Sequence, residues 1–171
     1  MDTFFEQIIP IKKTGATIAS IIGIWFAALI LCAALYIFGF YFLGSLTLLL
    51  IVGIIYGAFK LSTLFNVEYE YIVTNGTMDI DKITNKSSRK RMLSFELSNV
   101  TRLEKYNASA LNNVNAKSVV FACNATDPNA YFMVAEKEGK GASYLVFSPD
   151  ERIKEACIKF IPKFIVNSAF K

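Results

Sequence analysis

The chain has 171 residues, of which 54% are hydrophobic and 19% charged, and its formal net charge is +4. Residues 14–59 contain no Asp, Glu, Lys or Arg, which excludes a wholly soluble protein and a disordered chain. The weak positive balance does not indicate a nucleic-acid partner. No histidine occurs, and Cys32, Cys123 and Cys157 lie far apart, so we expect no metal site, no cofactor and no His-dependent catalysis.

Residues 1–13 form the first predicted segment and precede the uncharged run. Apolar residues there fall at i, i+1, i+4 and i+5, ahead of a proline: Phe4, Phe5, Ile8 and Ile9. This spacing predicts a short amphipathic helix that lies in the membrane interface and ends at Pro10. A frayed tail is the alternative interpretation.

The uncharged run is too long for one membrane span. A straight helix of its 46 residues would be about 69 Å long, more than twice the roughly 30 Å hydrocarbon core. Two spans fit better, over residues 14–38 and 43–61, with the chain turning between Gly39 and Gly44. We therefore predict a two-helix transmembrane hairpin within residues 14–64.

The flanking charges predict the orientation of this hairpin. Lys12 and Lys13 precede the first span and Lys60 closes the second, whereas the turn carries aromatic residues and no charge. By the positive-inside rule, both termini face the cytoplasm, as expected of a multi-pass protein of the bacterial inner membrane. Residues 65–171, with 15 of the 18 basic and 12 of the 14 acidic residues, then form a cytoplasmic domain.

Small residues recur at every fourth position on both spans: Gly15, Ala19, Gly23 and Ala27 on the first, and Gly53 and Gly57 on the second. Spacing of four places small residues on one helix face and lets two helix backbones approach closely. We predict that these residues pack the spans together, with Gly57 near Gly23 and Gly53 near Ala27. A homodimer formed through the same faces is the alternative.

Seven strand-like runs follow the hairpin. The first two flank Asn75-Gly76, and Asn-Gly between alternating segments is the strongest short-range signal for a β-hairpin. The runs cover Glu68–Thr74, Thr77–Ile83, Arg91–Leu97, Val100–Tyr106, Lys117–Asn124, Ala130–Glu138 and Ser143–Phe147.

A single amphipathic helix is predicted to close the domain. Ser148, Pro149 and Glu151 fit a capping box with Ser148 as N-cap, and Pro162 is expected to end or kink the helix. An apolar stripe follows at helical spacing: Ile153, Ala156, Cys157, Phe160, Ile161 and Phe164.

Seven antiparallel strands and one C-terminal helix are the element order of a pleckstrin-homology-like (PH-like) fold, a curved sheet or barrel closed by the helix. The chain resembles the bacterial PH-like domains that follow paired transmembrane helices, on Tyr69–Gly76, Met78–Ile83, Arg89–Arg91 and Ser94–Val100. Its layout is also similar to a small family of membrane proteins of Gram-positive bacteria. The resemblance implies a mainly-β (α+β) domain that binds lipids or proteins and is not an enzyme.

The densest basic cluster lies between the second and third predicted strands: Lys86, Arg89, Lys90 and Arg91. With Lys82 it is similar to the phosphoinositide motif of eukaryotic PH domains, although the loop is displaced by one hairpin. Each Lys or Arg near an anionic leaflet contributes about 1 kcal/mol of attraction, so the cluster predicts binding of membrane lipids. A solvated hairpin tip is the alternative.

Two other features of the sequence are candidate sites. Glu68 with Glu70, and Asp79 with Asp81, share a strand face, but the alternation predicts that this face points outward and that the carboxylates are solvated. Residues 107–116 are small and polar and predict a surface loop that either contacts a partner or has no function.

We expect a membrane-anchored scaffold that localises an unidentified protein partner at the cytoplasmic face. An anionic-lipid sensor that uses the basic loop and an accessory subunit of a membrane complex are the alternatives.

Overall fold

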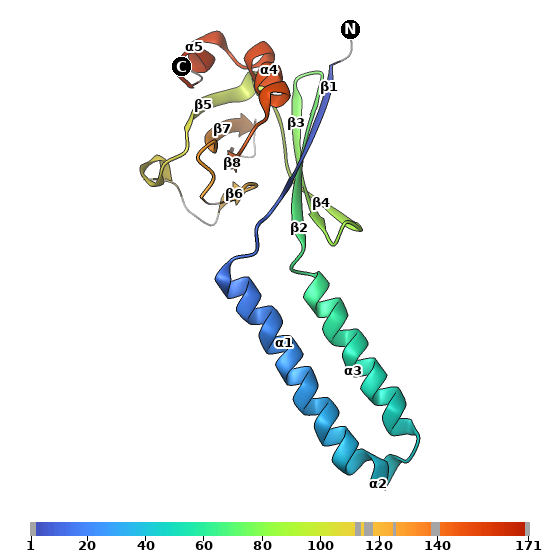
Figure 1. Ribbon diagram of the computed structural model, residues 1–171. Coiled ribbons are helices and arrows are strands. Elements are labelled where there is room, and N and C mark those ends of the chain that lie inside the picture. Colours follow the sequence, from blue (N-terminus) through green and yellow to red (C-terminus); the bar gives the residue numbers. More distant parts are fainter. Residues whose placement is uncertain (1–2, 112–113, 115–117, 125, 138–140, 170–171) are drawn as a thin grey trace. The chain divides into compact units, whose positions relative to one another are not determined.

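The computed structural model describes residues 3–111, 114, 118–124, 126–137 and 141–169 (Figure 1). The contacts divide the chain into two units. The hairpin unit comprises Lys12–Val67 and Thr84–Lys86, and the sheet unit comprises Met1–Ile11, Glu68–Ile83 and Ser87–Lys171.

The hairpin unit contains two stretches that are long and apolar enough to span a membrane, Gly15–Leu43 with 29 residues and Leu46–Thr63 with 18. The Thr14 side chain caps the first helix by accepting from the Thr17 N–H at 3.3 Å. The helices are α1 (Gly15–Ala34), a π-helical turn η1 (Leu35–Gly39), α2 (Phe40–Leu43) and α3 (Leu46–Thr63).

The turn of the hairpin lies later than predicted. The first stretch does not end at Phe38 but continues to Leu43, and the chain reverses at Gly44, where φ is +55°. Gly39 lies against α3 instead of forming the turn. A Cβ at this position would lie 2.9 Å from Cγ2 of Thr47, on α3. The glycine thus permits close contact between the two helices at this position.

The first sheet has the order β1-β2-β3-β4, with β1 (Phe4–Pro10), β2 (Val67–Thr74), β3 (Thr77–Thr84) and β4 (Ser88–Glu96). β1 pairs antiparallel with β2, from Phe4 opposite Thr74 to Pro10 opposite Glu68. Figure 1 shows the two strands side by side, although 56 residues separate them along the chain.

The helix predicted for residues 4–9 is therefore wrong. Phe5 and Ile9 point inward and pack against the main core, while Phe4 and Ile8 lie exposed on the outer face. Between them, the Gln7 side chain donates to the Ser148 carbonyl at 3.0 Å and accepts from the Asp150 N–H at 2.8 Å. These long-range contacts stabilise β1 as a strand.

The second sheet has the order β5-β7-β8-β6, with β5 (Val100–Lys105), β6 (Val119–Phe121), β7 (Tyr131–Lys137) and β8 (Gly141–Phe147). β6 runs parallel to β8, whereas the β5–β7 and β7–β8 pairs are antiparallel. The described residues thus form eight strands in two sheets. The predicted single seven-stranded antiparallel sheet or barrel is wrong in three respects, because β1 is an additional strand, the strands form two sheets, and β6 pairs parallel with β8.

Two helices follow the last strand, α4 (Glu151–Phe160) and α5 (Lys163–Ala169). The N-cap is Asp150, whose Oδ1 accepts from the Ile153 N–H at 2.9 Å, and not Ser148 as predicted. Ile161 is extended before Pro162, which confirms that the proline ends α4. The chain then starts a new helix, so Phe164 is 77% exposed and does not continue the apolar stripe.

The main core fills the space between the first sheet, the second sheet and α4. It includes Tyr71, Met78, Leu145, Phe147 and Ile153, all without solvent exposure. Aromatic and branched side chains at alternating strand positions meet here with the apolar stripe of α4, and this burial drives the folding of the sheet unit.

Candidate functional site

The outer face of the first sheet carries a cluster of ion pairs. We call it the outer charge cluster, and its members are Glu70 of β2, Asp79 and Asp81 of β3, and Arg89 and Arg91 of β4. Arg89 Nη1 lies 2.8 Å from Glu70 Oε2. Arg91 Nη1 lies 2.7 Å from Asp79 Oδ2, and its Nε and Nη2 pair with the two carboxylate oxygens of Asp81.

The carboxylates of this cluster are buried beneath the arginines. Glu70 is fully buried and Asp81 nearly so, while the side chains of Arg89 and Arg91 are 59% and 49% exposed. The prediction that the acidic pairs are solvated is therefore wrong for Glu70 and Asp81. Alternation correctly placed them on the outer face, but it could not show that arginines from β4 cover them.

Burial has an electrostatic consequence for Glu70. Removal from water raises the pKa of its carboxyl, and a hydrogen bond with the Glu6 side chain raises it further, against the opposing effect of Arg89. Glu6 lies on the same face, opposite Ile72 in the β1–β2 register.

The ion pairs divide the predicted lipid-binding residues into two groups. Arg89 and Arg91 are engaged with the acidic residues of the sheet. In the part of the chain that the structure describes, Lys82, Lys86 and Lys90 have no ion-pair partner. The structure thus does not bring all five cations together as one anion site, and lipid binding by this set stays a prediction.

The small residues of the first span lie on the surface of the hairpin unit. Gly15, Ala19, Gly23 and Ala27 are exposed, and a Cβ built at any of the glycines in the predicted stripes, Gly53 and Gly57 included, would meet no atom within 4 Å. Within the hairpin, the buried side chains are instead those of Ala28, Thr47 and Ala58. Packing of the two spans through these residues, or of two copies of the chain, stays a prediction.

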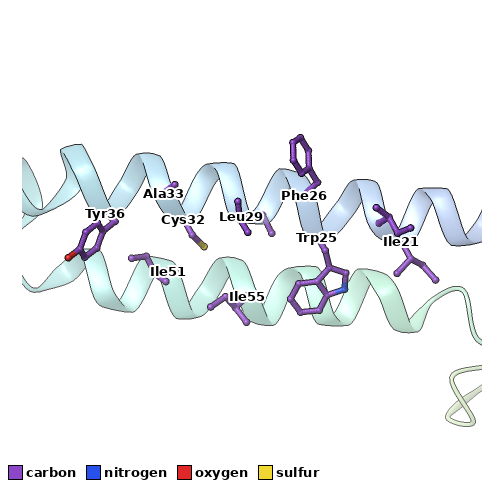
Figure 2. Close-up of a pocket in the computed structure, with 11 residues that line it drawn as sticks. Ile21, Trp25, Phe26, Leu29, Cys32, Ala33, Tyr36, Ile51 and Ile55 are labelled. Carbon is purple, nitrogen blue, oxygen red and sulfur yellow. The ribbon is translucent and has the colours of Figure 1, made fainter.

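An apolar hollow of about 850 Å³ runs along the helices of the hairpin (Figure 2). Trp25 of α1 extends toward α3 there, and Ile51 and Ile55 of α3 lie on the same side. Its lining is apolar apart from Cys32, the Tyr36 hydroxyl and the indole N–H, so it lacks the convergent polar groups of a specific ligand site. In a bilayer these side chains would face lipid tails.

Metal-ligand clusters and thiols are two features of catalytic sites that can be compared with the residues that the structure describes. They contain no group of three or more Cys, Asp or Glu side chains placed to hold a metal ion. Burial raises the pKa of Cys123 to about 11 and that of Cys157 to about 12, so both thiols stay protonated near neutral pH and are poor nucleophiles.

The predicted partner loop at residues 107–116 is only partly described. Ala108–Leu111 form a 3₁₀ turn, η3, in which Asn107 Oδ1 accepts from the Ala110 N–H at 2.8 Å. Ala110 is buried in a second apolar cluster with Val119, Phe132 and Val146. The start of the loop is therefore packed, and residues 112–113 and 115–117 lie outside the described residues.

Two four-stranded sheets that enclose a core and are followed by C-terminal helices, with a pair of apolar helices inserted between β1 and β2, are consistent with a PH-like domain that carries a candidate membrane hairpin. The chain belongs to the family described as a bacterial PH-like domain (DUF6106), which matches residues 1–167. The match includes β1 and the hairpin as well as the sheets. No curated protein and no solved structure matches the chain.

Proposed function

We propose that the protein is a membrane-anchored binding module that holds a protein partner at the cytoplasmic face of the bacterial inner membrane. Membership of the PH-like family supports a binding or scaffold role in general. The observation that carries the proposal is the position of the hairpin, which is inserted between two paired strands of the binding domain.

This insertion restricts the membrane topology. Pro10, the last residue of β1, lies opposite Glu68 near the start of β2, so the chain leaves the sheet and returns to it at the same end. Only an even number of crossings can do so without breaking the sheet. Two crossings satisfy this condition, and Lys12, Lys13 and Lys60 at the same end favour the cytoplasmic side.

The inserted hairpin supports a mechanism in which the binding domain is localised at the membrane. A domain tied to the membrane at both ends of a hairpin meets any partner in the same membrane at a raised effective concentration, so a weak contact becomes sufficient. Phe164 of α5 and Met92 of β4 are large apolar side chains exposed on the sheet unit, and they offer positions at which such a contact can be sought.

The outward position of the small residues favours a second candidate function, as an accessory subunit of a membrane complex. Gly53 lies on the surface of α3 with open space beside it, which suits close approach by a helix of another protein. In this case the hairpin, and not the sheet unit, would contact the partner.

Site-specific photo-crosslinking in cells distinguishes the two candidates. A photoreactive residue is placed at Met92 or Phe164 in the sheet unit, or at Val52 beside Gly53 in the hairpin, in the full-length protein. The scaffold proposal expects a defined protein adduct from a sheet-unit position, identified by mass spectrometry. Adducts from Val52 alone would support the accessory subunit, and adducts from neither unit would overturn both proposals.

A further inference from the structure

Two turns of the first sheet adopt left-handed backbone conformations with different residues. In the β2–β3 turn, Asn75 and Gly76 have φ of +48° and +89°. In the β3–β4 turn, Asn85 and Lys86 have φ of +51° and +55°. Asparagine tolerates this region and glycine adopts it freely, but a lysine is strained there because its Cβ crowds the backbone. The chain thus holds a lysine where glycine would relieve strain.

The strained turn is attached to the end of the second membrane helix. The Asn85 N–H donates to the carbonyl of Asn66 at 2.8 Å, and Asn66 is three residues beyond the end of α3 at Thr63. Thr84–Lys86 accordingly belong to the hairpin unit. Lys86 is exposed, and among the described residues it has no ion-pair partner.

The net charge of the protein resides in this unit. The hairpin unit contains four lysines, Lys12, Lys13, Lys60 and Lys86, and no acidic residue. Of the 18 basic residues, 14 then remain in the sheet unit, where they balance its 14 acidic residues. The formal charge of +4 therefore belongs entirely to the ends of the apolar helices and to the turn bonded there, at the level where lipid headgroups would lie.

We infer that Lys86 is a membrane-contact residue, and that the strained β3–β4 turn presents its ammonium, with Lys13 and Lys60, to anionic lipid headgroups. This inference rests on the proposed membrane anchoring. It differs from a headgroup pocket formed by the whole basic loop, because Arg89 and Arg91 already pair with Glu70, Asp79 and Asp81. A bilayer fits these charges better than an acidic protein, because three of the four lysines flank the spans in sequence.

The single tryptophan provides a direct measurement. Trp25 lies in α1 and is 42% exposed on the hairpin, so lipid tails with bromine atoms will quench its fluorescence. The full-length protein is reconstituted in dibrominated phosphatidylcholine, and unbrominated phosphatidylglycerol is added. The recovery of fluorescence then gives the binding constant of the anionic lipid relative to the zwitterionic one.

The test compares Lys86→Gly with Lys159→Gln. Lys159 Nζ bonds to Thr3 Oγ1 at 3.0 Å, and the Thr3 N–H donates to Asn75 Oδ1, so this lysine lies at the opposite end of β3. Eight strand residues place it about 26 Å from the Asn85–Lys86 turn, well beyond the roughly 10 Å screening length at 0.1 M salt. Both variants remove one positive charge.

We expect the wild type to prefer phosphatidylglycerol at about 0.1 M salt. Lys86→Gly should lower this preference by about twofold or more, since a single juxtamembrane lysine changes binding by roughly fivefold at the site that it contacts. Lys86→Arg should retain the preference, and Lys159→Gln should leave it unchanged. Because glycine suits the turn, Lys86→Gly should also raise the thermal unfolding temperature, so lost binding cannot be attributed to lost structure.

Equal preferences in the wild type and Lys86→Gly would overturn the inference, as would equal losses in Lys86→Gly and Lys159→Gln. If brominated lipid does not quench Trp25 at all, the hairpin does not lie in the bilayer and the membrane anchoring itself fails. The photo-crosslinking result does not depend on lipid preference, so it tests the proposed function separately.

Discussion

The two faces of the first sheet bury their side chains by different means. On the inner face Tyr71 is fully buried in the main core, and its hydroxyl donates to the Ala122 carbonyl at 2.7 Å and accepts from the Ser148 N–H at 3.2 Å. On the outer face the neighbouring Glu70 is equally buried, but its cover is the half-exposed side chain of Arg89.

The two kinds of burial have opposite effects on the free energy of folding. Removing an aromatic ring from water is favourable, and the hydroxyl of Tyr71 keeps its hydrogen bonds. Removing a carboxylate from water is unfavourable, and an ion pair offsets that penalty only in part. We therefore expect the inner face to supply the stability, and the outer face to respond to pH and to loss of its arginine.

The largest effect is expected for Tyr71→Ala. Loss of the ring leaves a cavity in the main core and should lower the free energy of unfolding by about 3–5 kcal/mol. The control Tyr71→Phe keeps the ring but leaves the Ala122 carbonyl and the Ser148 N–H without their partner, at a cost of about 1–3 kcal/mol. Chemical unfolding of the full-length protein in detergent micelles measures both. A cost below 1 kcal/mol for Tyr71→Ala would contradict the assignment of the inner face.

A smaller loss of stability is expected when Arg89, which covers Glu70 on the outer face, is replaced. Arg89→Ala leaves Glu70 buried without its cation and should destabilise the sheet unit by about 1–2 kcal/mol, less than for a deep pair because the arginine is solvent-exposed. Adding Glu70→Gln should recover most of this loss. Lys90→Ala is the matched control on the same strand and should have no measurable effect.

The pH dependence of stability also distinguishes the faces. Burial and the Glu6 hydrogen bond raise the pKa of Glu70 above its usual 4.5, so the folded state binds this proton more tightly than the unfolded chain does. The resulting stabilisation is fully present below about pH 4.5 and is lost as the pH rises through the folded-state pKa.

Glu70→Gln cannot ionise, so its stability relative to wild type should increase as the pH rises above about 4.5. The free energy of unfolding of both proteins is measured from about pH 4.5 upward at constant ionic strength. The control is Tyr71→Phe, whose free energy of unfolding should change with pH in the same way as that of wild type. A Glu70→Gln difference that falls with rising pH would show that Arg89, and not burial, controls this carboxyl.

The smallest effect is expected for Phe4→Ser. Phe4 lies on the outer face and is 62% exposed, so its loss should change the free energy of unfolding by no more than about 0.5 kcal/mol. A matched change of the inward neighbour, Phe5→Ser, should cost several times more, because Phe5 packs against the main core. Equal losses of free energy of unfolding in Phe4→Ser and Phe5→Ser would mean that the outer face of β1 is covered in solution.

Local patterns in the sequence were sufficient for much of the fold. Asn75-Gly76 predicted the β2–β3 turn correctly, and β2 to β8 each fall on a predicted strand. The apolar stripe of α4 was also found, since Ile153, Ala156 and Cys157 are buried together. These features depend on neighbours within a few residues, and periodicity is informative at that range.

The errors occur where a distant segment determines the local structure. Residues 4–9 fit a helical spacing and a strand almost equally well, and pairing with β2 decides between them. The backbone of Ser148 is bonded to Tyr71 and Gln7, so the helix begins later, at the cap Asp150. The outer charge cluster likewise needed the order of β2, β3 and β4, which shows that Arg89 lies within reach of Glu70.

The insertion of the hairpin also fixes the order in which the protein can be assembled. β1 is synthesised first, and its partner strand follows only after 56 further residues. At about 5–20 residues per second, β1 waits roughly 3 to 11 seconds for β2. Under the proposed membrane anchoring, the helices enter the bilayer and return during this interval. Insertion of one helix alone would leave β1 and β2 on opposite sides of the membrane, so closure of the first sheet excludes molecules in which the chain has crossed only once.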